Sequence, residues 1–138
     1  MSIVQTQTTS FKKELYEAVH NLSTDSIYIA LYTGDANLNA DTTTYSATNE
    51  VSATGYTAGG QALTGVAINS SDYTAYVNWA NVSWTAAITA RCALIYNVTQ
   101  GNKSIAVIDF GADKTSTTTF TITMPANTAT TALIRSSN

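Results

Sequence analysis

The chain is poor in cysteine, histidine, proline and charge. Its 138 residues include one cysteine, Cys92, one histidine, His20, and a single proline, and only 11% of them are charged. A single cysteine forms no internal disulfide, so the folded state depends on packing or on assembly with other chains. We expect Cys92 to be a small buried apolar residue. One histidine and one cysteine are too few for the usual structural zinc set, so no metal site is predicted.

The few charges that are present argue against nucleic acid and membrane partners. Nine carboxylates against six Lys and Arg give a net charge of −3, which leaves no basic footprint for nucleic acid or for an anionic membrane. The longest apolar runs are far short of the roughly 20 residues that cross a bilayer. The first seven residues, MSIVQTQ, lack the charged and apolar segments of a signal peptide. The sequence therefore predicts a soluble protein without a signal peptide.

The sequence contains no recognisable pattern of a catalytic or cofactor-binding site. The carboxylates are scattered and mostly beside turns, and neither a D-x-D-x-D-G calcium pattern nor a G-x-S-x-G elbow occurs. The stretch GYTAGGQA has the G-x-x-x-x-G spacing of a phosphate-binding loop, but Gln61 and Ala62 stand where that loop needs Lys and Ser or Thr. We predict no catalytic, cofactor-binding or metal residues and no enzymatic activity. In place of a phosphate site, the glycines of GYTAGGQA (Gly55, Gly59 and Gly60) are expected to allow positive φ and close approach of the backbone.

Hydroxyl groups supply much of the polarity that charge does not. The chain has 25 threonines, whose β-branched side chains suit a pleated surface that is half in water. Its length leaves room for one domain, 1–138. We predict an all-β protein, a β-sandwich or jelly-roll-like barrel over residues 26–136, with one N-terminal amphipathic helix.

The N-terminal part is expected to differ from the rest. Residues 1–9 have no periodicity and predict a flexible arm that orders against a partner. A helix is predicted over residues 10–22, with Ser10 as its cap. Its apolar face follows the helical spacing and comprises Phe11, Leu15, Ala18, Val19 and Leu22.

Several strands are readable from alternation and turn residues. SIYIALYTG is apolar on both faces and predicts a central strand, while QALTGVAI predicts another. ITARCALIYN and KSIAVIDFG flank a Gly-containing turn and predict a hairpin. In DYTAYVNWANVSWT the alternation shifts phase, which predicts a bulge or turn near Ala80 and Asn81. Residues 35–60 are long for a loop, so they are expected to fold over the sheet or to contact a neighbouring subunit.

Four aromatic residues admit two interpretations. Trp79, Trp84, Tyr73 and Tyr76 are close in sequence and would suit a platform that binds glycans. Residues of this type are more often part of a core or of a subunit contact, where their large area is buried.

A family resemblance is carried by four segments in order: FKKELYEAVHNL, IYIALYTGDANLNADTTTYSATNEVSATGYTAGGQALTGV, RCALIYN and IAVIDFGADKT. They resemble a group of small proteins encoded among the virion structural genes of tailed bacteriophages. The likeness extends from about Phe11 to Arg135. Cys92 departs from the family, in which a small residue such as Gly or Ala is expected.

The resemblance implies a component of the virion and carries no catalytic motif. The expected function is that of a head decoration or cement protein, which binds the phage capsid as a homo-oligomer and bridges neighbouring capsid subunits. The alternative is a tail, collar or host-facing fibre component, with glycan binding through the surface aromatics. We expect the arm (1–9) and residues 35–60 to make contacts between chains, with strand addition at a sheet edge as a plausible mode.

Overall fold

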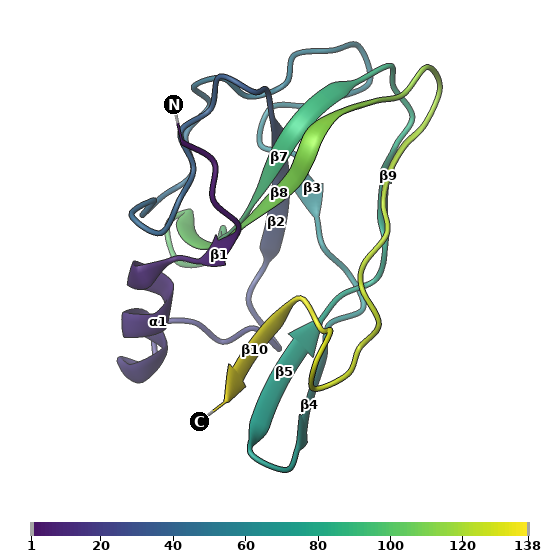
Figure 1. The fold of residues 1–138 in the computed structure, drawn as a ribbon. Coiled ribbons are helices and arrows are strands. Elements are labelled where there is room, and N and C mark those ends of the chain that lie inside the picture. Colours follow the sequence, from purple (N-terminus) through teal and green to yellow (C-terminus); the bar gives the residue numbers. More distant parts are fainter. Residues whose placement is uncertain (1, 138) are drawn as a thin grey trace.

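The computed structural model describes residues 2–137, and it confirms the all-β prediction (Figure 1). One helix, α1 (Thr9–Tyr16), accompanies antiparallel sheets. The strands are β1 (Thr6–Gln7), β2 (Ile27–Tyr32), β3 (Gln61–Ala62), β4 (Ala67–Ser71), β5 (Thr74–Asn78), β6 (Val82–Trp84), β7 (Thr89–Asn97), β8 (Lys103–Thr115), β9 (Phe120–Ile122) and β10 (Ile134–Ser137).

These strands form three sheets. The largest has the order β1-β8-β7-β2-β3, a second has the order β10-β5-β4, and β6 pairs with β9 alone. The finer prediction of a two-sheet sandwich or a jelly-roll barrel is therefore not confirmed. The predicted strand QALTGVAI is divided between the first two sheets, because the chain leaves β3 after Ala62 and pairs again only from Ala67.

The predicted hairpin is confirmed and forms the middle of the large sheet. β7 pairs antiparallel with β8, and the turn between them places Gly101 and Asn102 at φ 76° and 64°. β2 lies between β7 and β3, as expected for a central strand. Both of its faces are buried, since Ile29 packs in one cluster and Tyr32 in another.

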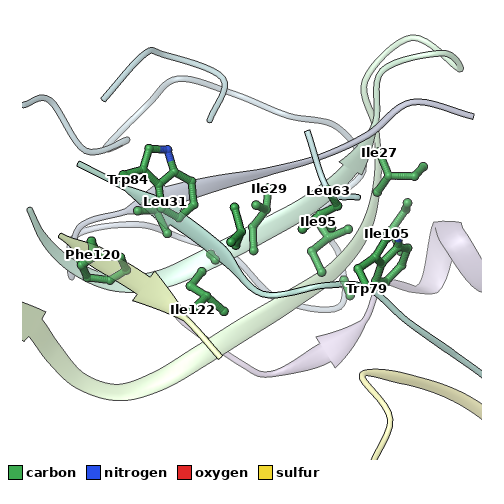
Figure 2. Close-up of a cluster of buried hydrophobic side chains, with 14 of the residues drawn as sticks. Ile27, Ile29, Leu31, Leu63, Trp79, Trp84, Ile95, Ile105, Phe120 and Ile122 are labelled. Atoms are coloured by element: carbon green, nitrogen blue, oxygen red, sulfur yellow. The ribbon is translucent and has the colours of Figure 1, made fainter. Parts of the chain in front are cut away.

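The main core lies between the large sheet and the small ones (Figure 2). Ile29 and Ile95 of the large sheet face Trp84 and Phe120 of the β6–β9 pair. In place of the predicted bulge or turn near Ala80 and Asn81 there is a break between strands, because β5 ends at Asn78, β6 begins at Val82 and the two belong to different sheets. This break places Trp79 and Trp84 in the same core, each 5% exposed.

The helix is shorter than the predicted range 10–22, and its cap is Thr8 and not Ser10. The Thr8 hydroxyl accepts a hydrogen bond from the Phe11 amide. The helix ends at Tyr16 because Ala18 adopts φ 57°. In this reversal the Val19 amide donates to the Glu14 carbonyl, which is the hydrogen-bond pattern that terminates many helices.

The N-terminal arm is ordered against its own chain, which corrects the prediction of a flexible arm. Thr6 and Gln7 pair with Val107 and Ala106 on the edge of β8. Earlier in the arm, the Val4 amide donates to the Leu38 carbonyl. The unpaired edge of β8 supplies the hydrogen bonds that sequence reasoning expected from a partner.

Residues 35–60 fold over the large sheet, one of the two predicted outcomes. Glu50 fixes this segment, because its carboxylate accepts hydrogen bonds from the Tyr45 hydroxyl (2.6 Å), the Tyr56 hydroxyl (2.6 Å) and the Gly59 amide (2.7 Å). Tyr45 in turn stacks on Tyr96 of β7, with ring centroids 4.8 Å apart.

The interpretation of the three glycines in this segment is confirmed. Gly55, Gly59 and Gly60 have φ of 93°, 97° and 81°. A Cβ on Gly60 would lie 1.8 Å from the Ile29 carbonyl oxygen, and one on Gly55 would lie 2.5 Å from the Thr85 carbonyl oxygen. Positive φ and close approach of the backbone therefore account for the glycines of this stretch.

Candidate functional site

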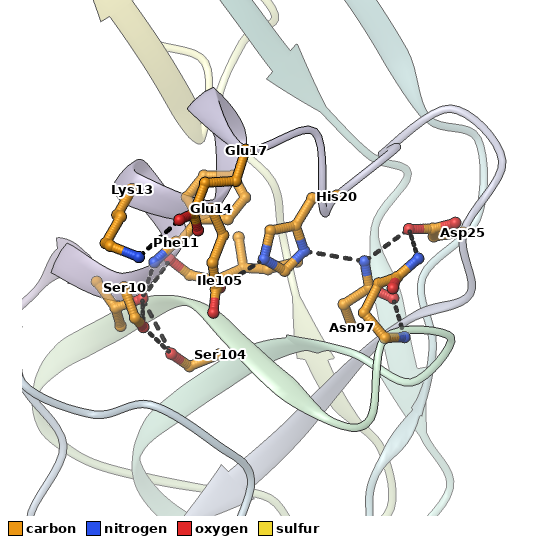
Figure 3. A network of polar contacts seen from close by, with 12 residues as sticks. Ser10, Phe11, Lys13, Glu14, Glu17, His20, Asp25, Asn97, Ser104 and Ile105 are labelled. Atoms are coloured by element: carbon orange, nitrogen blue, oxygen red, sulfur yellow. Dashed lines mark hydrogen bonds and ion pairs between the residues drawn. The ribbon is translucent and has the colours of Figure 1, made fainter.

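His20 is part of a polar network that the chain satisfies internally (Figure 3). The Asn97 side-chain amide donates to His20 Nδ1 (3.0 Å) and to Asp25 Oδ2 (2.9 Å), and His20 Nε2 lies 2.9 Å from Glu14 Oε1. Since Nδ1 accepts a bond in this arrangement, the ring proton is on Nε2 and is donated to Glu14. Both ring nitrogens therefore have partners within the chain, and the role of His20 is to hold α1 against β7.

The predicted environment of Cys92 is confirmed, since this side chain is fully buried in β7. Burial raises the pKa of its thiol to about 11, which keeps the sulfur protonated and unreactive at neutral pH. Within residues 2–137, no group of three or more His, Cys, Asp or Glu side chains has the geometry to hold a metal ion.

The four aromatic residues do not come together at a surface, so a glycan platform built on the tryptophans is wrong. Trp79 and Trp84 are core residues, and Trp84 contacts Phe120 in an edge-on arrangement at 6.2 Å between ring centroids. Tyr73 is 84% exposed at the turn between β4 and β5, and Tyr76 is half-buried in β5. The second interpretation is confirmed for the two tryptophans, which are part of the core.

A long hollow of the described surface follows the line along which the β1 and β8 edge of the large sheet faces β10 and β9. We call it the side groove, and it consists of three cavities that share lining residues. The first cavity, which we call the helix end of the side groove, has a volume of about 820 Å³ and lies between α1 and the β10-β5-β4 sheet. The neck, about 340 Å³, lies between β1 and β10, where the Gln7 side-chain amide donates to the Arg135 carbonyl (2.8 Å). The β9 end, about 680 Å³, lies between β8 and β9.

Apolar side chains are unusually exposed along the side groove. Among the described residues six large apolar side chains are exposed, and three of them line the helix end: Leu15 (41%), Tyr16 (94%) and Ile68 (50%). At the β9 end the lining includes Phe110, Met124 and Leu133, which cover the flank of the main core. Exposed apolar side chains that gather around a groove are typical of contacts with other molecules.

Charge is segregated at the side groove. Lys12 and Arg135 line the helix end and Lys114 lines the β9 end, whereas no Asp or Glu lines any of the three cavities. Three of the six cations of an acidic chain are thus placed where none of its nine carboxylates lies. No ion pair joins these three to another side chain of residues 2–137, in contrast to the pairs Lys13–Glu17 and Arg91–Asp109. The side groove is therefore electropositive relative to the rest of the surface.

Sequence reasoning missed the side groove. Helical spacing placed Leu15 on a buried face, but α1 ends one residue later and β10 lies across an open space from it. The residues expected to form contacts between chains only partly contribute: Gln5, Thr6 and Gln7 of the arm line the groove, whereas residues 35–60 do not. One available signal was Tyr16, an aromatic residue outside the predicted apolar face.

A comparison with known protein families, curated proteins and solved structures found no match to the chain. No helix of residues 2–137 is long and apolar enough to cross a membrane.

Proposed function

We propose that this chain is a non-enzymatic structural component of a tailed-phage virion, and specifically a head decoration or cement protein. In this role it binds the capsid as a homo-oligomer and bridges neighbouring capsid subunits. The resemblance of four ordered sequence segments to virion proteins supports the class of protein. The side groove supports a function based on contacts between protein chains.

The observation that carries the proposal is the coincidence of apolar and cationic side chains in the side groove. Exposed Leu15, Tyr16 and Ile68 favour burial against another protein, because apolar surface gains about 25 cal/mol per Å² when it is removed from water. Lys12, Arg135 and Lys114 favour a partner with carboxylates on its surface. Three cations spaced along an acidic chain are too few for a nucleic acid backbone.

A bridging protein needs two contact regions, and the side groove provides them at its two ends. The β9 end, with Lys114 and the apolar flank of the core, is the proposed contact with a capsid subunit. The helix end is the proposed contact between copies. Each contact is modest, and many copies on many equivalent capsid sites give strong net attachment.

The alternative position, in the tail, collar or a host-facing fibre, uses the same groove for a different neighbour. The glycan-binding form of this alternative loses two of its four proposed residues, because Trp79 and Trp84 are in the core. Imaging of the intact virion, together with copy number per particle, separates the positions. Hundreds of copies on the head support decoration, a few to a dozen copies at the tail or neck support the alternative, and absence from the virion overturns both.

A binding assay on particles that lack this protein tests the contact itself. Lys114→Glu reverses a cation in the β9 end, and Lys103→Glu makes the same change in charge outside the side groove. We expect the first variant to lower occupancy at least tenfold at a fixed concentration and the second to bind as the unaltered chain does. Equal binding of both variants would contradict docking through the β9 end.

A further inference from the structure

We infer that the helix end of the side groove receives the tip of the β4–β5 hairpin from a second copy of this chain. The inference rests on the proposed function, in which the side groove is a contact between proteins, and it names the occupant of one end.

The β4–β5 hairpin projects from the body of the molecule (Figure 1), and its outer half leaves the large apolar residues Ile68 and Tyr73 exposed. From Ile68 to Tyr73 every residue is exposed, and buried residues begin only at Val77. Two residues, Asp72 and Tyr73, make the turn, since Ser71 pairs directly with Thr74. The whole length of β10 pairs with β5, but the outer half of this three-stranded sheet has no covered face, so the tip of the hairpin gains from packing against another surface.

The tip combines an aromatic ring with a carboxylate. Tyr73 is 84% exposed, and a tyrosine of this kind supplies large contact area with few rotatable bonds. Asp72 is held at φ 53°, a conformation that Asp adopts more readily than most residues. The short turn therefore presents both side chains at the end of the hairpin.

The helix end of the side groove has the complementary chemistry. Its lining offers Leu15 and Tyr16 for contact with an aromatic ring, and Lys12 as a cation for a carboxylate. Its volume, about 820 Å³, falls in the range of sites that enclose a small molecule, which is enough for the side chains of a two-residue turn.

A second copy, and not the same copy, has to supply the tip. Ile68 and Ala75 of the hairpin form part of the wall of the helix end. A hairpin that builds the wall of a groove does not also insert its own turn into that groove. Because each copy has one tip and one groove, the contact joins different surfaces of two copies and generates a ring when the rotation closes.

Sedimentation of the full chain over a range of concentrations tests this inference. We expect reversible self-association, and we expect Tyr73→Ala and Lys12→Asp each to raise its dissociation constant at least tenfold. Lys103→Glu, outside the groove, should leave the constant unchanged. The altered side chains at 12 and 73 are exposed, so the thermal midpoints of the variants should match that of the unaltered chain.

A charge exchange gives the sharper result. Asp72→Lys alone should also weaken self-association, and combining it with Lys12→Asp should restore it to within about threefold, because the tip and groove are again of opposite charge. A chain that is monomeric at all concentrations, or single variants that associate as the unaltered chain does, would overturn the inference. If particle occupancy persists in either case, the proposed binding to the capsid stands and the contact between copies at the helix end is wrong; if occupancy is also absent, both fail.

Discussion

Replacing Gly60 by Ala tests whether close packing of residues 35–60 on the large sheet is essential for stability. The added Cβ would lie 1.8 Å from the Ile29 carbonyl oxygen and 2.8 Å from the Ala30 Cα. Gly101 is a matched control, because its φ of 76° is close to the 81° of Gly60 and nothing lies within 4 Å of the corresponding Cβ. Both substitutions place a residue with a Cβ at positive φ, and only Gly60→Ala also brings that Cβ against the backbone of β2.

The magnitudes follow from that difference. Gly101→Ala should lower the free energy of unfolding by about 1 to 2 kcal/mol, the cost of a left-handed conformation for a residue with a Cβ. In Gly60→Ala the carbonyl of Ile29 must also move by more than 1 Å within a packed sheet. This displacement disturbs the short β2–β3 pair and the Leu63 amide bond to the Ile27 carbonyl. We expect a total loss of about 4 kcal/mol.

Urea unfolding followed by tryptophan fluorescence measures both values, since Trp79 and Trp84 are each 5% exposed and report on the main core. Equal midpoints for the two variants would refute the claim that close approach of the backbone requires Gly60. A Gly60→Ala variant as stable as the unaltered chain would refute the packing of residues 35–60 altogether.

The other predictions concern single features of the fold. Glu50→Gln should lower the free energy of unfolding by about 2 to 3 kcal/mol in urea, since two hydroxyls and an amide lose a charged acceptor, whereas an unchanged midpoint would contradict this role. Ala18→Gly should raise it by about 0.5 to 1 kcal/mol, because Ala18 has φ 57°; a loss would argue against that helix ending. Deleting residues 1–9 should lower the thermal midpoint by several degrees, because it removes β1 and the Thr8 cap; an unchanged midpoint would restore the free-arm prediction.

The remaining prediction of this group concerns pH. Burial alone would raise the pKa of Asp25, but hydrogen bonds from the Asn97 side chain, the Asn21 amide and the Gln100 side chain hold it below its ordinary value. Its contribution to stability is therefore present above about pH 4 and lost as the pH falls through the lowered pKa. Asp25→Asn should flatten this part of the acid unfolding curve, and an unchanged slope would contradict the assignment.

Local signals in the sequence predicted the elements whose partners are near in the chain. The β7–β8 hairpin follows from its Gly-containing turn, and the role of Gly60 follows from its place at the end of a long segment. The helix prediction failed at Ala18, because apolar spacing continues past it and the residue that ends the helix is not the usual glycine.

The side groove is formed by residues that are far apart in the sequence, and the spacing of apolar residues within one segment does not predict such contacts. Leu15 and Ile68 come from elements more than fifty residues apart, and their exposure depends on a gap between two sheets. Helical periodicity predicts that a helix has an apolar face, and it gives no information about whether another element covers that face. The same limit explains why the arm was predicted to be free, since the unpaired edge of β8 is a property of the sheet and not of residues 1–9.

Because the chain has few charges, a high salt concentration should weaken its contacts with other molecules more than it weakens its fold. Within residues 2–137 two ion pairs join side chains of opposite charge, Lys13–Glu17 and Arg91–Asp109, and the exposed pair Lys13–Glu17 contributes little to stability. Raising the salt concentration to about 1 M shortens the screening length to about 3 Å and weakens the contacts proposed for Lys12, Lys114 and Asp72, while apolar packing in the core is retained. Under the proposed function, the chain should therefore dissociate from the virion in its folded state when salt is added, and bind again when the salt is removed.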